Sequence, residues 1–164
     1  MKTIKFIAGC AMLVSAGAAF SHGNADHAKA DAAVVKEQQA WGIAGDAKAV
    51  QRTITLRMTD DMRFTPDAIT VKQGETLRLR VENKGKILHE VVLGTPDTLE
   101  EHAQLMVKFP TMEHDEPYMA HVAPGKTGEL LWQFNRPGKF DFACLIAGHF
   151  QAGMRGTITV TPTP

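Results

Sequence analysis

The chain has 164 residues, of which 44% are hydrophobic, and its 18 Lys and Arg balance its 18 Asp and Glu. This length suits one domain with a buried core, and the charge balance gives no reason to expect a strong field for nucleic acid or anionic membranes. Two cysteines are too few for a disulfide-rich scaffold.

Residues 1–21 have the pattern of a secretory signal peptide. Two lysines form a positive start, an apolar run follows over residues 6–14, and small residues come next. The run is too short to span a membrane. Cleavage after Ala18 and cleavage after Ser21 both fit this pattern, and either one predicts a periplasmic protein.

Removal of this segment leaves Cys144 as the one cysteine of the exported chain. It also removes two lysines, so the net charge becomes about −2. A free thiol in an oxidising compartment is prone to oxidation, and a bound metal would protect it. The single cysteine therefore favours a metal ligand over a disulfide.

Residues 22–51 are rich in Ala, Lys and Asp, which predicts a flexible N-terminal arm before a domain at 52–164. His22 and His27 lie near the start of this arm. They are either solvated histidines or, if cleavage exposes the amine of His22, part of a Cu(II)-binding terminus.

From residue 52 onward, hydrophobic and polar residues alternate in short runs that are separated by Gly and Pro turns. This pattern predicts an all-β sandwich or barrel. One short helix is expected at 95–109, where Thr95 and Pro96 form an N-terminal cap and apolar residues follow at helical spacing. Strands are expected at 53–58, 68–72, 76–81, 87–93, 129–134, 140–144 and 156–160.

An irregular loop that is rich in Met and His is expected at 110–121. One interpretation is that the methionines pack and the histidines are exposed. The alternative is an additional copper site, because thioethers select Cu(I). The ligands of this second site would be Met112, His114, Met119, His121 and His22.

The clearest candidate site lies in residues 140–160. Two phenylalanines alternate with Cys144 along a strand, and glycines then bend the chain so that His149 and Met154 return toward it. A second imidazole is expected from His89, at the start of an earlier strand. A thiolate, two imidazoles and a thioether suit electron-transfer copper, whereas zinc sites do not use thioethers.

The spacing Cys144-x4-His149-x4-Met154, with His89 upstream, resembles the type 1 copper site of cupredoxins, and this resemblance covers roughly residues 52–162. It implies a Greek-key β-sandwich or barrel with the inserted helix. It also implies one type 1 copper bound by His89, Cys144 and His149, with Met154 as a weak axial ligand.

The family resemblance further implies that a redox partner would dock near His149. The expected apolar docking patch consists of Leu145, Ile146, Phe150 and Ala152. Many cupredoxins follow the first His with an Asn that ties down the ligand loop, but this chain has Glu90. That difference leaves the hydrogen bonding around the ligands open.

Within the family, the His-bearing N-terminus, the segment Trp41–Asp46 and the Met/His loop resemble periplasmic copper-tolerance cupredoxins of the CopI type. This predicts a copper-handling protein with a redox-active centre. The alternative is an electron shuttle between respiratory or photosynthetic partners, and a third hypothesis is a metal-free adhesion module. The chain carries no enzyme signature, although weak oxidation of Cu(I) stays open as an activity.

Overall fold

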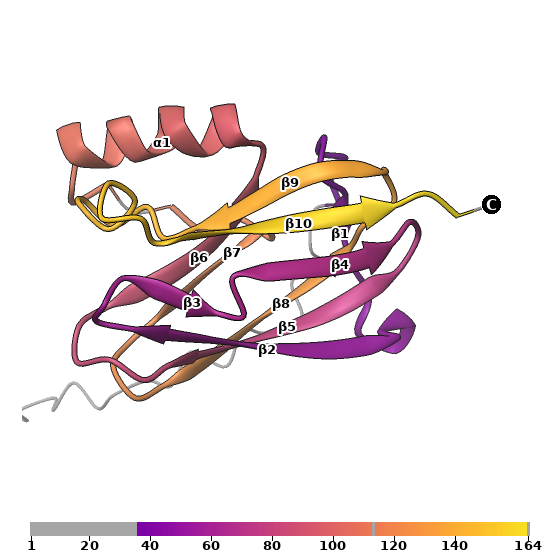
Figure 1. Ribbon diagram of the computed structural model, residues 1–164, viewed down its shortest axis with the longest axis horizontal. Coiled ribbons are helices and arrows are strands. Elements are labelled where there is room, and N and C mark those ends of the chain that lie inside the picture. Colours follow the sequence, from indigo (N-terminus) through magenta and orange to yellow (C-terminus); the bar gives the residue numbers. More distant parts are fainter. Residues whose placement is uncertain (1–35, 113, 164) are drawn as a thin grey trace, which may run out of the picture. The chain divides into compact units, whose positions relative to one another are not determined.

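The computed structural model describes residues 36–112 and 114–163, which form a sandwich of two five-stranded sheets (Figure 1). In spatial order, the first sheet contains β1 (Ile43–Ala44), β8 (Thr127–Gln133), β5 (Thr76–Asn83), β2 (Arg52–Thr59) and β3 (Arg63–Thr65). The second sheet contains β4 (Ala68–Lys72), β10 (Arg155–Thr161), β9 (Gly138–Ala143), β6 (His89–Gly94) and β7 (Met119–Val122). The all-β class expected from the sequence is confirmed.

Alternation of apolar and polar residues explains why these segments are strands. In β4, Ile69 and Val71 are buried while the residues on either side of them are exposed. Ile158 and Val160 in β10 repeat the pattern, and the two strands pair in parallel with Ile158 opposite Ile69. Successive side chains of a strand point to opposite faces, so each strand contributes one apolar row to the interior.

The main core lies between the two sheets. Leu79, Trp132 and Phe142 are among its fully buried large side chains. Burial of a side chain of this size stabilises the fold by about 1.5–3 kcal/mol. The same core contains Cys144 and Met154, so two of the four predicted copper ligands are part of it.

The helix α1 (Pro96–Lys108) is the inserted helix that the sequence predicts. Thr95 caps it: its side chain accepts a hydrogen bond from the backbone N–H of Thr98, and the Thr98 hydroxyl accepts one from the backbone N–H of Thr95. The apolar side of α1 covers the outer face of the second sheet near β6 and β9 (Figure 1). Every residue of β6 is therefore buried, on both faces of the sheet.

The end of the predicted N-terminal arm lies on the sandwich. Trp41 is buried, and its carbonyl accepts a hydrogen bond from Trp132 Nε1 at 3.0 Å. Next to it, β1 pairs with β8, and the short 3-10 helix η1 (Ala47–Ala49) follows. A two-residue strand is too short to show periodicity, so the pattern could not distinguish it from an arm. Residues 1–35, including His22 and His27, lie outside the described residues.

The predicted loop at 110–121 ends earlier than expected. Residues 119–122 form β7, which pairs with β6 so that His89 lies opposite Val122 and Glu90 opposite His121. This pairing brings the Met/His segment alongside the strand that carries the first predicted ligand. Among the described residues, no helix has the length and apolar composition needed to cross a membrane.

Candidate metal centre

Three predicted ligands meet at one end of the second sheet. His89 begins β6, Cys144 directly follows β9, and His149 lies in the loop from β9 to β10. Their ligand atoms all lie within 4.8 Å of one another, and His89 and Cys144 are fully buried. Cys144 Sγ lies 3.2 Å from His149 Nδ1. Sulfur and nitrogen atoms that bind one metal at about 2.3 and 2.0 Å, at an angle near 100°, would lie about 3.3 Å apart.

Asp60 determines which nitrogen of His89 is available. Its carboxylate Oδ1 lies 3.1 Å from His89 Nε2, and the backbone N–H of Lys86 donates to the same carboxylate at 2.8 Å. That backbone hydrogen bond, helped by His89, lowers the pKa of Asp60. An ionised carboxylate only accepts hydrogen bonds, so Nε2 carries the proton of the neutral imidazole. His89 Nδ1 is then a free lone pair, and it has no hydrogen-bond partner among the described residues.

The Cys144 thiol is held in a dry environment. Burial raises its pKa to about 12, so the metal-free thiol is protonated at neutral pH and metal binding must release that proton. The backbone N–H of Glu90 donates to Cys144 Sγ at 3.4 Å. Burial, followed by the nearby His89, lowers the pKa of His149 and keeps its imidazole neutral. A neutral imidazole is the form that binds metal.

Backbone hydrogen bonds close the ligand loop. The N–H of Cys144 donates to the carbonyl of Met154, and the N–H of Met154 donates to the carbonyl of His149, both at 3.0 Å. Gly148 and Gly153 have φ values of 89° and 93°, which residues with a side chain rarely adopt. Met154 is fully buried in the main core, which also contains Cys144. The segment from Cys144 to Met154, whose spacing predicted the site, therefore folds into a loop that backbone hydrogen bonds hold in one shape.

Glu90 occupies the position where many cupredoxins have Asn. Its side-chain Oε1 accepts a hydrogen bond from the backbone N–H of Leu145 at 2.7 Å, in fully buried surroundings. The carboxylate thus fastens the residue next to Cys144, which resolves the question that the sequence left open. Its other oxygen, Oε2, lies 2.7 Å from His121 Nε2, and the carboxylate raises the pKa of His121. Glu90 and Asp60 were not among the predicted site residues, because neither has a motif of its own.

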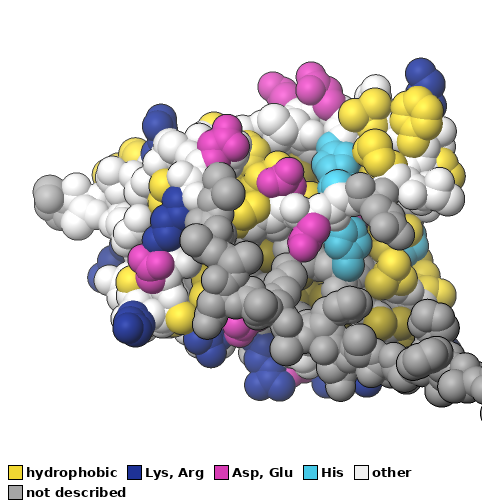
Figure 2. All heavy atoms as spheres, turned by 180° about the vertical axis from the view of Figure 1, so that it is seen from behind, with side chains coloured by type: hydrophobic (Ala, Val, Ile, Leu, Met, Phe, Trp, Pro, Cys, Tyr) yellow, Lys and Arg dark blue, Asp and Glu magenta, His cyan; other side chains and the backbone are white. Residues whose placement is uncertain are grey.

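The expected docking patch is wrong for two of its four members. Leu145 and Phe150 are buried under α1 in a second hydrophobic cluster, while Ile146 is half-buried and Ala152 is exposed. Ile87 and Leu88, in the turn before β6, are 43% and 46% exposed. One face of the molecule shows histidine side chains beside exposed hydrophobic ones (Figure 2).

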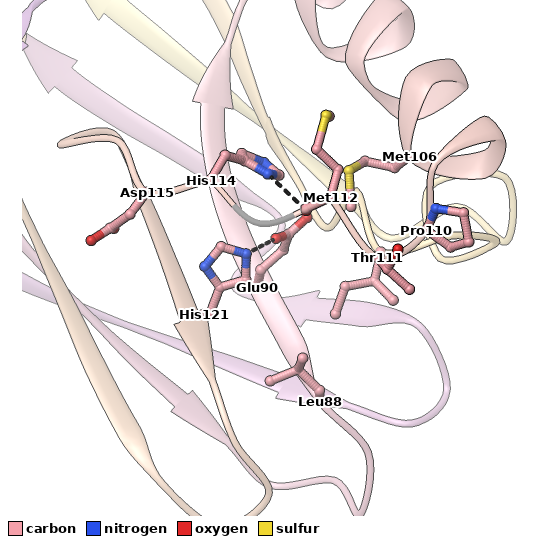
Figure 3. A pocket seen from close by; sticks show the side chains of 10 residues that line it. Leu88, Glu90, Met106, Pro110, Thr111, Met112, His114, Asp115 and His121 are labelled. Carbon is pink, nitrogen blue, oxygen red and sulfur yellow. Dashed lines mark hydrogen bonds and ion pairs between the residues drawn. The ribbon is translucent and has the colours of Figure 1, made fainter. Parts of the chain in front are cut away.

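The Met/His segment contributes to an open cavity of about 730 Å³ next to the metal centre (Figure 3). Met112, His114 and His121 lie on its wall as the sequence suggested, but Met119 does not. Met119 is buried in the second hydrophobic cluster, because it points inward from β7. The residues that line the cavity are Leu88, Glu90, Met106, Pro110, Thr111, Met112, His114, Asp115, His121 and Ile146.

A β-sandwich that brings two histidines and a cysteine together in this way has the architecture of a blue copper protein. The chain belongs to the cupredoxin family: the model of the cupredoxin-like domain matches residues 10–160. Copper is the cofactor of this family, and the donor set of His89, Cys144 and His149 fits it.

Curated relatives point to one group within the family. The copper-resistant cuproprotein CopI of Rubrivivax gelatinosus is 47% identical over 150 residues, which cover 92% of this chain and 89% of that protein. CopI of Pseudomonas aeruginosa is 37% identical over 76% of this chain and 84% of its own. Among solved structures, reduced auracyanin from Roseiflexus castenholzii has a TM-score of 0.60 at 19% identity, and it covers 69% of this chain and 99% of its own. That likeness concerns the fold alone.

Proposed function

We propose that the protein is an exported, periplasmic copper-binding cupredoxin that contributes to copper tolerance. Its type 1 copper would be held by His89 Nδ1, Cys144 Sγ and His149 Nδ1 and, more weakly, by the thioether of Met154. The observation that carries the proposal is the convergence of one thiol and two imidazoles within 4.8 Å at a buried site. The similarity to two proteins named for copper resistance supports the physiological role.

Bound copper supplies one-electron chemistry, because this donor set accommodates both Cu(II) and Cu(I). The chain provides a site that is already assembled. Asp60 orients His89, the Glu90 carboxylate fastens the loop after Cys144, and the Glu90 N–H reduces the charge on the thiolate. Supporting contacts of this kind fix ligand geometry and tune the potential of a metal site.

The ligand assignment is tested with Cys144→Ser in the purified, signal-cleaved protein. Loss of the intense thiolate-to-copper absorption, with the β-sheet circular dichroism unchanged, is expected. Survival of that absorption would contradict the assignment. Deletion of the gene is expected to make the source strain copper-sensitive, and the Cys144→Ser allele should fail to restore tolerance.

An electron shuttle is the second candidate function, and the exposed Ile87 and Leu88 near the ligand loop favour it as a docking surface for a redox partner. A shuttle would be reduced rapidly by one electron-transfer protein, and its deletion would slow respiration at ordinary copper levels. Copper sensitivity without a respiratory defect would support the tolerance role. Copper binding underlies both candidate functions. Weak oxidation of Cu(I) is a separate activity, and it would be measured as oxygen uptake when Cu(I) is added.

A further inference from the structure

We propose a second copper site in the cavity between α1 and β7, with Glu90, His114 and His121 as its ligands. The site is formed by residues outside the Cys144 centre, and its geometry does not depend on that centre holding metal. Only the choice of copper over other borderline divalent ions rests on the proposed copper-tolerance role.

The contact between Glu90 and His121 has the geometry of two ligands of one ion. Glu90 Oε2 and His121 Nε2 lie 2.7 Å apart. A nitrogen and an oxygen that bind one metal at about 2 Å, at right angles to each other, are separated by about 2.8 Å. Apart from this ion pair, Glu90 Oε2 has no partner among the described residues, so a bound ion would not compete with another contact for this oxygen.

His114 presents a free nitrogen to the same cavity. Its Nδ1 lies 3.3 Å from the carbonyl of Met112, which can only accept a hydrogen bond, so Nδ1 carries the proton. Its Nε2 is buried and has no hydrogen-bond partner in the described part of the chain. His89 in the first centre is similar: the Asp60 carboxylate contacts one ring nitrogen, and the other nitrogen has no partner among the described residues.

The two histidine rings of the second site are farther apart than those of the first. The rings of His89 and His149 lie 5.0 Å apart, centroid to centroid, and those of His114 and His121 lie 5.8 Å apart. Within the described residues, only the first site has three His, Cys, Asp or Glu ligand atoms already within 4.8 Å of one another. Metal binding at the second site therefore requires His114 to move toward Glu90 and His121 from the loop between α1 and β7.

Two methionines make the cavity selective for copper. Met106 and Met112 line it beside His114 (Figure 3). Met106 is nearly buried, whereas Met112 is 41% exposed at the edge. Imidazole and carboxylate bind Cu(II) well, and thioethers favour Cu(I), so both oxidation states find suitable ligands in one cavity.

The test counts copper in the mature full-length protein carrying His22→Ala and His27→Ala, which removes the N-terminal histidines as competing ligands. After loading with Cu(II) and dialysis, about two copper ions per chain are expected in this parent. The double variant His114→Ala/His121→Ala is expected to bind about one, with the visible absorption of the Cys144 centre unchanged. A second Cu(II) electron paramagnetic resonance signal, without thiolate absorption, should be present in the parent and absent in the variant.

Glu90→Gln tests the carboxylate ligand of the second site: the negative charge is lost, while an amide oxygen can still accept from the Leu145 N–H. This substitution is expected to lower the affinity for the second copper ion at least about tenfold. Glu129→Gln, an exposed control, should leave that affinity unchanged. Met112→Leu should weaken Cu(I) retention relative to Met62→Leu.

One copper per chain in the parent, equal stoichiometry in parent and double variant, or displacement by equimolar Zn(II) would each overturn the proposal. Loss of the thiolate absorption in the parent would instead contradict the proposed function.

Discussion

Removal of the Asp60 carboxylate should weaken copper binding without removing any ligand. Asp60 Oδ1 contacts His89 Nε2 at 3.1 Å, and no other described residue holds that nitrogen. In Asp60→Ala the imidazole loses both its preferred tautomer and its fixed orientation. Loss of such a supporting contact costs about 10–100-fold in metal affinity, or about 1.4–2.8 kcal/mol.

The assay is competition for copper against a chromophoric chelator, with the metal-free stability measured by urea unfolding. Asp60→Asn should lose less affinity than Asp60→Ala, because its amide oxygen can still accept from Nε2. Asp61→Ala, in the same turn, is the matched control. Gly85→Ala gives an independent perturbation, because its Cβ would overlap Asp60 Oδ1 and lie 3.2 Å from His89 Nε2. Affinity within twofold of the parent in Asp60→Ala would refute the role assigned to this carboxylate.

Three further substitutions test the ligand set and the core. Met154→Leu should retain copper and raise the reduction potential measured by voltammetry, because an axial thioether bond is weak; loss of the metal would contradict an axial role. Phe142→Ala should lower the free energy of unfolding by about 3–5 kcal/mol, against less than about 0.5 kcal/mol for the exposed Leu88→Ala. Trp132→Phe removes the donor to the Trp41 carbonyl and should cost about 1 kcal/mol. It should also accelerate amide exchange around Trp41, and unchanged exchange would show that this contact does not hold the segment.

Local patterns were sufficient for most of the β-sandwich. The strands β4 and β10 alternate between buried and more exposed residues, and α1 has a capped start and an apolar side. The ligands of the first centre could be proposed from the sequence in the same way, because three of the four lie within one loop of the chain. The loop is short, so the glycines and backbone hydrogen bonds that shape it are close in sequence as well as in space.

Contacts between segments that are far apart in the chain could not be predicted from local sequence patterns. The sequence did not assign Trp41 to the core, because its partner Trp132 is 91 residues away. Leu145 and Phe150 looked like surface residues of the ligand loop, but α1 covers them. Met119 looked equivalent to Met112 until the pairing of β6 with β7 turned it inward.

The sequence alone therefore determined the class of fold and predicted the residue types of the first site, since both depend on periodicity and on residue types within short stretches. Only the tertiary structure decided what surrounds the ligands. Asp60 lies in the turn between β2 and β3 and contacts His89 at the start of β6. Glu90 on β6 contacts the loop after Cys144 with one carboxylate oxygen and His121 on β7 with the other. These contacts arise from sheet pairing between segments that are far apart in the chain, and side-chain spacing along one segment contains no information about them.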